Sequence, residues 1–163
     1  MSRVEKKTNT IHANCLSLGD KGILLTGPSG CGKSALTLAL IERAEWAKQR
    51  SLLVSDDYTE IFGKNGRLYG RPPAALAGGI EIRGAGLYAM AFKEEAVIDF
   101  AVTLGEDYER FPTGKMVSFC GVEVPVFNLP GLNTADGLTI CQAIEALCFK
   151  TLWQNSDQVV KSC

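Results

Sequence analysis

The residues with the clearest chemical signature fit the phosphate-binding pattern G-x-x-x-x-G-K-[ST]. They are Gly27, Pro28, Ser29, Gly30, Cys31, Gly32, Lys33 and Ser34. In such a loop the glycines let backbone N–H groups turn toward an anion, and the positive end of the following helix faces the same anion. Lys33 then reaches the β- and γ-phosphates, and the Ser34 hydroxyl holds Mg²⁺. The pattern predicts a nucleoside triphosphate site, with a glycine-rich strand-to-helix turn as the structural alternative.

A second group of candidate residues is the acid pair Asp56 and Asp57, which follows the short apolar run 51–55. Carboxylates at the carboxyl end of a strand, beside a phosphate loop, lie where α/β sheets bind their ligands. Because consecutive strand residues face opposite sides, we expect one carboxylate to face the phosphates and the other to face the flank. A solvated acid pair in a turn is the alternative interpretation.

Other charged residues are ambiguous when their pattern is considered alone. Glu81 and Arg83 alternate with two isoleucines, so both leave one face of a short strand, and an exposed strand face is the simpler interpretation. His12 is the only histidine, and a structural role is the simpler interpretation for it. Arg110 lies in the charged segment 105–112, which is typical of a solvated loop.

The composition limits the class of protein. The chain has 163 residues, 46% of them hydrophobic, which suits one globular domain. A net charge of -1 indicates no basic surface for nucleic acid or for an anionic membrane. No apolar run approaches the roughly 18 residues that cross a bilayer, and the basic N-terminus lacks the apolar core of a signal peptide. We therefore expect a cytoplasmic protein with neither nucleic acid nor membrane as a partner.

The six cysteines are scattered through the chain without a C-x-x-C pair, so buried, reduced thiols are expected rather than a zinc site or disulfides. Cys31 differs because it lies in the phosphate loop beside a helix N-terminus, which lowers the pKa of a thiol. A redox switch at Cys31 is one hypothesis, and a tolerated residue without a role is the other.

The elements that must position these residues follow from hydrophobic periodicity and turn signals. An apolar strand at 22–26 leads into the phosphate loop, and a helix leads out of it and continues to about residue 50. The other predicted elements are strands at 11–18, 51–55, 58–61, 68–69, 87–91, 96–104, 116–119 and 122–127, and an amphipathic helix from about 136 or 139 to 153. We expect a disordered N-terminus at 1–10, one α/β domain at 11–153 and a tail at 154–163.

In this order the chain resembles the catalytic domain of the HPr kinase/phosphorylase family. The matching motifs are Ile11-His12, the phosphate loop, Val54-Ser55-Asp56-Asp57, Ile80-Glu81-Ile82-Arg83-Gly84-Ala85-Gly86 and, more weakly, Tyr108-Glu109-Arg110. The phosphate loop is generic, whereas the Glu-Ile-Arg-Gly-x-Gly segment after an Asp-Asp strand end is specific to this family. The resemblance implies a P-loop-containing single domain with a mixed central sheet and flanking helices, similar to HPr kinase and PEP carboxykinase.

The resemblance also implies an activity, in which ATP and Mg²⁺ serve to phosphorylate a regulatory serine of HPr, a phosphocarrier of the sugar phosphotransferase system. Many family members reverse this reaction with inorganic phosphate, and the family forms homohexamers. Asp57 matches the acid that takes the proton from the serine hydroxyl. His12, Lys33 and Arg110 match other active-site positions, and Ser34 and Glu81 match metal ligands.

Two departures from the family pattern carry expectations of their own. Typical members have an additional N-terminal domain, so this sequence resembles a short form with the catalytic domain only. The family's Pro-Val-Arg-Pro-Gly-Arg segment, tied to the reverse reaction, corresponds to residues 125–132, which contain no arginine. We therefore predict weak or absent phosphorylase activity. Extra residues near 46–49 are interpreted as a longer helix end.

Two other functions compete with the kinase hypothesis. One is a small-molecule kinase or NTPase that uses the same loop, and the other is a non-enzymatic module that senses ATP. Asp57 distinguishes the last of these from an enzyme, because a pure nucleotide binder requires no proton acceptor beside the γ-phosphate.

Overall fold

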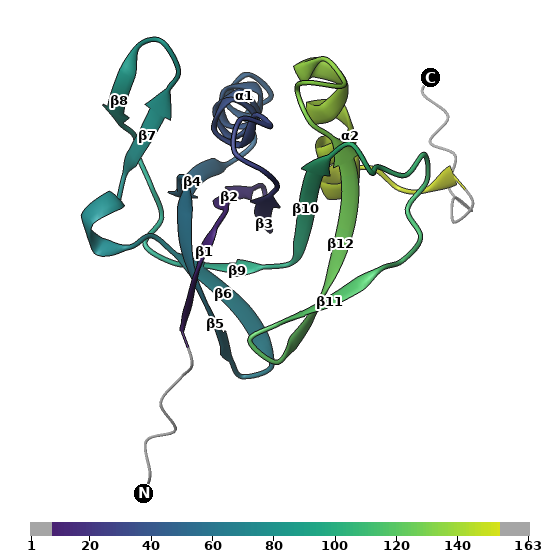
Figure 1. Ribbon diagram of the computed structural model, residues 1–163, viewed down its shortest axis with the longest axis horizontal. Helices are drawn as coiled ribbons and strands as arrows, with labels where there is room; N and C mark the ends of the chain where they lie inside the picture. The colour runs from purple at the N-terminus through teal and green to yellow at the C-terminus, as the bar shows by residue number, and fades with distance from the viewer. Residues whose placement is uncertain (1–7, 154–163) are drawn as a thin grey trace, which may run out of the picture.

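The computed structural model describes residues 8–153, in which strands outnumber helices (Figure 1). The strands are β1 (Asn9–His12), β2 (Asn14–Leu18), β3 (Lys21–Thr26), β4 (Ser51–Ser55), β5 (Tyr58–Lys64), β6 (Arg67–Arg71), β7 (Gly79–Ile82), β8 (Gly86–Ala89), β9 (Ala96–Ile98), β10 (Phe100–Gly105), β11 (Met116–Phe119) and β12 (Val122–Pro130). The helices are α1 (Lys33–Trp46), the 3₁₀ turn η1 (Ala74–Leu76) and α2 (Gly137–Phe149).

The elements form three layers. The central layer is a six-stranded mixed sheet with the order β11-β12-β10-β3-β2-β4. Figure 1 shows α1 and α2 above this sheet and the strands of a smaller sheet, β1-β5-β6-β9, below it. Ile23 and Leu25 of β3 belong to the core under the helices, and Leu24 belongs to the core between the sheets. The predicted mixed α/β fold is confirmed, although helices cover one face of the central sheet and a second sheet covers the other.

Strand direction gathers the candidate residues at one edge of the central sheet. Strands β3 and β10 are parallel, and β2 is antiparallel to both β3 and β4. The carboxyl ends of β3 and β4 therefore lie at the same edge as the beginning of β2. In the register, Asn14 lies opposite Leu25, and Cys15 lies opposite Ser55. This edge holds the phosphate loop and the acid pair together.

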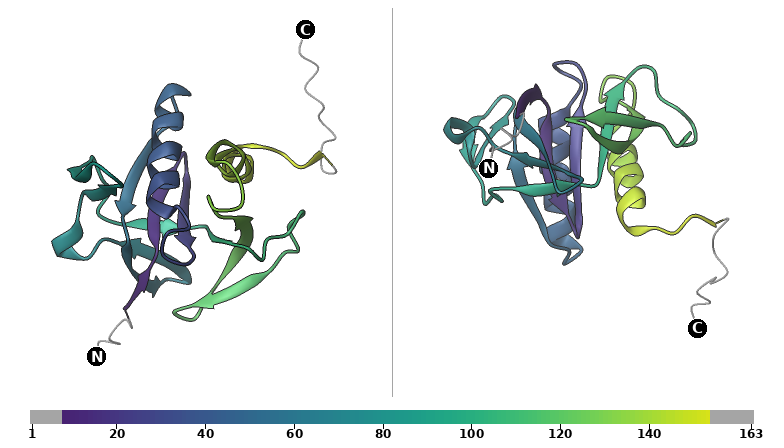
Figure 2. Two further views of the ribbon diagram at one scale, coloured as in Figure 1. Left: turned by 45° about the horizontal axis from the view of Figure 1, so that its top comes forward. Right: turned by 90° about the horizontal axis from the view of Figure 1, so that it is seen from below.

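The two-stranded sheet of β7 and β8 forms a hairpin beside α1. In all three views it lies on the side of α1 that faces away from α2 (Figures 1 and 2). Ile80 anchors the hairpin, since its side chain is fully buried in the core under the helices. Glu81, the next residue, is thereby exposed beside the phosphate loop.

Two predicted strands are each divided between the sheets, so their prediction as single strands is wrong. Segment 11–18 breaks at Ala13, where β1 of the small sheet ends and β2 of the central sheet follows. Segment 96–104 breaks at Asp99. The backbone N–H of Asp99 donates to the carbonyl of Gly22, and its carboxylate accepts the N–H of Gly22, both at 2.8 Å. The apolar pattern of segment 96–104 continues across its break because β9 and β10 are both largely buried, so periodicity alone does not reveal the crossing.

Helix α1 ends at Trp46, so the prediction that it continues to about residue 50 is wrong. Lys48 has the left-handed φ of 56°, and the N–H groups of Lys48 and Gln49 bond the carbonyls of Glu45 and Ala44 at 3.0 and 2.8 Å. This is the Schellman pattern that closes many helices. The sequence concealed it because a lysine occupies the position where glycine is usual.

The chain ends of the described region also differ from expectation. Asn9 and Thr10, expected in a disordered N-terminus, belong to β1 because they pair with Ile61 and Glu60 of β5. Helix α2 begins as predicted, where the Asp136 side chain accepts the N–H of Thr139, but it ends at Phe149 instead of residue 153. The expected disorder of 1–7 and the tail at 154–163 lie outside the described residues.

Candidate active site

The phosphate loop connects β3 to α1, and glycine is required at both of its ends. Gly32 has φ 102°, and a Cβ atom there would lie 2.4 Å from Leu132 Cδ1. Gly27 has φ 141°, and a Cβ atom there would lie 2.5 Å from the carbonyl oxygen of Leu104. Both conformations and both approaches exclude a side chain. The loop is therefore packed on β10 and on the segment after β12, while Ser29 at its tip is exposed.

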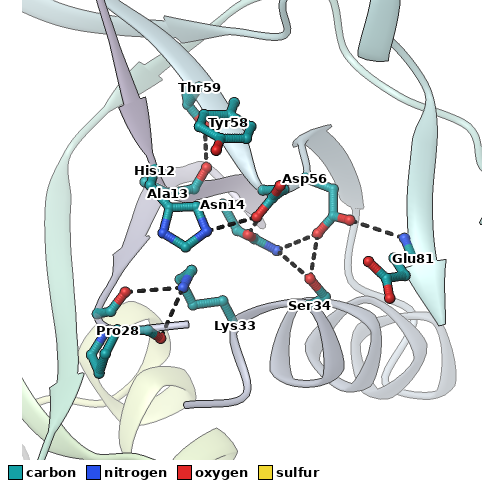
Figure 3. A network of polar contacts seen from close by, with 12 residues as sticks. His12, Ala13, Asn14, Pro28, Lys33, Ser34, Asp56, Tyr58, Thr59 and Glu81 are labelled. Carbon is teal, nitrogen blue, oxygen red and sulfur yellow. Dashed lines mark hydrogen bonds and ion pairs between the residues drawn. The ribbon is translucent and has the colours of Figure 1, made fainter. Parts of the chain in front are cut away.

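Lys33 begins α1 and is 6% exposed. Its Nζ atom donates hydrogen bonds to the carbonyls of Gly27 and Pro28 at 3.0 and 3.2 Å (Figure 3). Within residues 8–153 no carboxylate lies within ion-pairing distance of this ammonium group. A buried charge without a counter-ion is unfavourable, and a phosphate held by the loop would supply the opposite charge.

The structure separates the two acids of the pair. Asp56 is buried, and its Oδ1 atom accepts hydrogen bonds from Ser34 Oγ at 2.6 Å and from Asn14 Nδ2 at 2.7 Å (Figure 3). Its Oδ2 atom accepts the backbone N–H of Glu81 at 2.9 Å. The Asp57 side chain is 56% exposed, and its Oδ1 atom lies 2.7 Å from Nε2 of His12, which donates to it. One carboxylate is thus tied to the phosphate loop, and the other is open to an incoming group.

The oxygen atoms around Asp56 fit a magnesium ion bound together with a nucleotide. Ser34 supplies a hydroxyl group, and Asp56 and Glu81 supply carboxylates, which are the hard ligands that Mg²⁺ prefers. Among residues 8–153 no three His, Cys, Asp or Glu side chains are gathered closely enough to hold a metal by themselves. Mg²⁺ is usually held by one or two carboxylates together with substrate phosphates and water.

A cavity of about 480 Å³ brings most of the predicted site together. It is lined by His12, Ser29, Gly30, Gly32, Lys33, Ser34, Ala35, Leu38, Ala39, Glu42, Asp57, Glu81, Ile82, Arg83, Leu132 and Asn133. A proton acceptor at Asp57, a cation at Lys33 and metal-type ligands at Ser34 and Glu81 therefore face one space. This combination suits the transfer of a phosphoryl group.

Arg110 is the predicted site residue that the structure does not place with the others. It lies on the exposed segment between β10 and β11, with its guanidinium carbon 5.4 Å from the ring centre of Phe111. It lines a separate cavity of about 260 Å³, together with Phe127, Asn128 and residues of α2. No sequence pattern indicates the direction in which this loop leaves the sheet.

Sequence reasoning missed Asn14, which is fully buried at the beginning of β2 and contacts both members of the acid pair. The signal that marks it is an amide at the start of an apolar strand, two residues after His12. Its neighbour Cys15 is also buried, and desolvation raises the pKa of that thiol to about 12, so it stays neutral. Cys31 is 3% exposed and packs in the core under the helices, which favours a structural role over a redox switch.

Comparison with known proteins gives one consistent result. A family model described as "HPr Serine kinase C-terminal domain" matches residues 4–161. The HPr kinase/phosphorylase of Lactobacillus acidophilus is 31% identical over 158 residues, which are 88% of this chain and 47% of that protein. The HPr kinase/phosphorylase of Streptococcus uberis is 30% identical over 151 residues, 84% of this chain and 46% of that protein. The chain thus spans about half the length of the curated relatives it matches.

The fold has a solved counterpart. The structure of the HPr(Ser) kinase/phosphatase from Coxiella burnetii superposes with a TM-score of 0.71 at 28% sequence identity. The match covers 87% of this chain and 97% of that one. In residues 8–153 of the present structure no helix is both long and apolar enough to cross a membrane.

Proposed function

The chain belongs to the family of HPr serine kinase C-terminal domains, and from this membership we propose that it is a protein-serine kinase that transfers the γ-phosphoryl group of ATP to an HPr-type phosphocarrier. Such an activity would regulate the phosphotransferase system and carbon metabolism. The observation that carries the proposal is the exposed carboxylate of Asp57, held by His12 in the same cavity as Lys33. A module that only binds nucleotide would not require this proton acceptor. The family match does not favour the other alternative, a small-molecule kinase or NTPase.

Each residue of the site has a separate role in the proposed reaction. Phosphoryl transfer depends mostly on positioning and on neutralising charge. Lys33 pairs with the β- and γ-phosphates, and Ser34, Asp56 and Glu81 are the side chains that would hold Mg²⁺. The metal, when bound, neutralises phosphate charge. The serine oxygen attacks the γ-phosphorus, the bond to the β-phosphate oxygen breaks, and the serine proton passes to Asp57.

His12 supports Asp57 in this scheme. One oxygen of the Asp57 carboxylate accepts the hydrogen bond from His12 Nε2, and the other oxygen carries no hydrogen bond to any residue of the described region. The second oxygen is therefore the one that can receive the proton of the substrate hydroxyl. An exposed base suits a protein substrate, whose serine must be delivered from outside.

Labelled ATP tests the proposed function directly. Purified HPr, Mg²⁺ and this protein should give HPr labelled on its regulatory serine, and HPr with that serine replaced by alanine should remain unlabelled. Hydrolysis of ATP without any transfer to HPr would instead support the NTPase alternative.

Glu81→Gln is expected to raise the Mg²⁺ concentration for half-maximal activity on the order of tenfold, because a hard cation loses an anionic ligand. The backbone N–H of residue 81 would still bond Asp56, so the local fold should persist. Titration of transfer activity with Mg²⁺ measures the change. Glu123→Gln is the matched control, since Glu123 is an exposed strand residue of β12 that does not line the cavity. An equal metal requirement in both variants would make Glu81 an ordinary strand-face charge.

The reverse reaction is expected to be weak. It would use phosphate to remove the phosphoryl group of phosphoserine and release pyrophosphate, and it requires donors for a second anion. Of segment 125–132, the apolar Leu132 lines the catalytic cavity, whereas Phe127 packs edge-on against Phe100. Without the charged hydrogen bonds of two arginines, pyrophosphate release should be at least about tenfold slower than forward transfer.

Serine-phosphorylated HPr, Mg²⁺ and millimolar phosphate provide the assay for this direction, and forward transfer by the same preparation is the control. Pyrophosphate release at the forward rate would show that those arginines are dispensable.

Two parts of the proposal rest on the family resemblance alone. These are the role of Arg110 at the phosphates and the assembly into a homo-oligomer, a hexamer in the family. For Arg110 to meet a bound phosphate, the segment 106–115 must move toward the cavity or serve a neighbouring subunit. Light scattering measures the assembly. Cytoplasmic localisation, which was expected from the composition, stays a prediction.

A further inference from the structure

Asn14 connects the parts of the site through one buried amide. Its Nδ2 atom donates to Asp56 Oδ1 at 2.7 Å and to Thr37 Oγ1 at 3.1 Å. Its Oδ1 atom accepts the backbone N–H of Asp57 at 3.0 Å. Figure 3 shows the amide beside the ring of His12, with its nitrogen directed at the carboxylate of Asp56. The beginning of β2, the helix α1 and the end of β4 thus meet at a single side chain.

The partners fix the orientation of this amide. The Thr37 hydroxyl donates its hydrogen to the carbonyl of Lys33 at 2.8 Å, so it can only accept from Asn14. An ionised Asp56 carboxylate likewise only accepts, and the Asp57 N–H only donates. The NH₂ group must therefore face Thr37 and Asp56, and the oxygen must face Asp57. An apolar residue of the same size could satisfy none of the three.

The contacts with Asp57 come from both ends of one short segment. His12 holds the carboxylate of Asp57, and Asn14 holds its backbone N–H. Residues 12 and 14 flank the crossing at Ala13, where β1 ends and β2 begins. Asp57 has the left-handed φ of 65°, which is uncommon for a residue with a side chain. The Asn14 bond is a local restraint on that conformation.

We propose that Asn14 is a positioning residue for phosphoryl transfer, which holds the metal-side carboxylate of Asp56 and the base Asp57 in one fixed arrangement. The inference rests on the proposed function for the role of Asp57. A positioning role for Asn14 can be distinguished experimentally from that of an ordinary buried asparagine. An asparagine that only satisfies the core would affect stability, whereas a positioning residue affects metal response and turnover beyond its effect on stability.

Asn14→Ala is compared with Thr59→Val, a matched control. Thr59 is also fully buried, and its hydroxyl donates to the carbonyl of Ala13 at 2.7 Å, one residue before Asn14. Both variants lose buried hydrogen bonds at the same crossing, but Thr59 bonds neither carboxylate. Thermal melts of the two proteins measure the loss of stability.

Three readouts then separate positioning from packing. Hydrogen exchange of the ligand-free protein should show the Asp57 amide protected in the wild type and in Thr59→Val, and unprotected in Asn14→Ala. The gain in ATP affinity on adding Mg²⁺ should fall roughly 10-fold or more in Asn14→Ala, with metal-free affinity nearly unchanged. Turnover of transfer to HPr should fall roughly 10- to 100-fold with little change in KM for ATP.

The outcomes distinguish this inference from the proposed function. If the wild type transfers phosphate to HPr and Asn14→Ala matches Thr59→Val in metal response and turnover, Asn14 has no positioning role. If the wild type does not transfer to HPr, but Asn14→Ala loses Asp57 protection and the Mg²⁺ response, the proposed function fails and the positioning of the two carboxylates stands. Should Asn14→Ala not fold, Asn14→Ser serves instead. An unprotected Asp57 amide in the wild type would by itself overturn the inference.

Discussion

Replacing Lys33 with alanine is expected to remove phosphoryl transfer to the background of the assay, a loss on the order of 10²–10³ or more. ATP binding should also weaken, because the loop would lose the cation that we propose to face the β- and γ-phosphates. The fold should persist, since within residues 8–153 the ammonium bonds only two loop carbonyls, and alanine is the best helix former at the first position of α1. Transfer assays, ATP titration and a thermal melt measure the three effects.

Lys21→Ala is the matched control for that experiment. Lys21 is an exposed lysine at the opposite end of β3, so its loss removes the same charge without touching the loop. Wild-type turnover in Lys33→Ala, or an equal loss in both variants, would contradict the assignment of the phosphate site.

Asp57→Asn is expected to reduce transfer by roughly 10²–10⁴, the usual range for a lost general base, while ATP affinity changes only a few-fold. The amide has the same shape and can still accept the hydrogen bond from His12, so the effect isolates the missing proton acceptor. Asp57 bonds neither the loop nor Lys33, which is why nucleotide affinity should be spared.

Asp56→Asn provides the comparison, because it should also lower activity but for another reason. Asp56 lies beside Ser34 on the metal side, so excess Mg²⁺ should restore part of the activity of Asp56→Asn and none of that of Asp57→Asn. If Asp57→Asn is mild, or if Mg²⁺ rescues it, the two acids have exchanged roles.

Local chemistry could be predicted from the sequence wherever it depends on neighbouring residues. The strand before the phosphate loop is confirmed at β3, and the acid pair follows a buried strand as expected. The Asn65-Gly66 turn was predictable because both residues tolerate the positive φ angles of 52° and 72° that a tight hairpin requires.

Features that depend on distant partners could not be predicted in this way. Asn14 bonds residues 23 and 42 positions away, so its neighbourhood marks it as a buried amide without revealing its partners. The break at Asp99 depends on Gly22, which lies 77 positions earlier. The resemblance to a family carried the assignment of His12 and Glu81, whose own patterns favoured ordinary structural roles.

The crossing of the chain at Ala13 makes the arrangement around Asp57 depend on the docking of the two sheets. His12 belongs to the small sheet and Asn14 to the central sheet, so Asp57 is aligned only while the two sheets stay docked. The phosphate loop, by contrast, is anchored within the central layer and its helix. A sub-global opening that frees β1 would therefore remove the alignment of Asp57 and leave the phosphate loop folded.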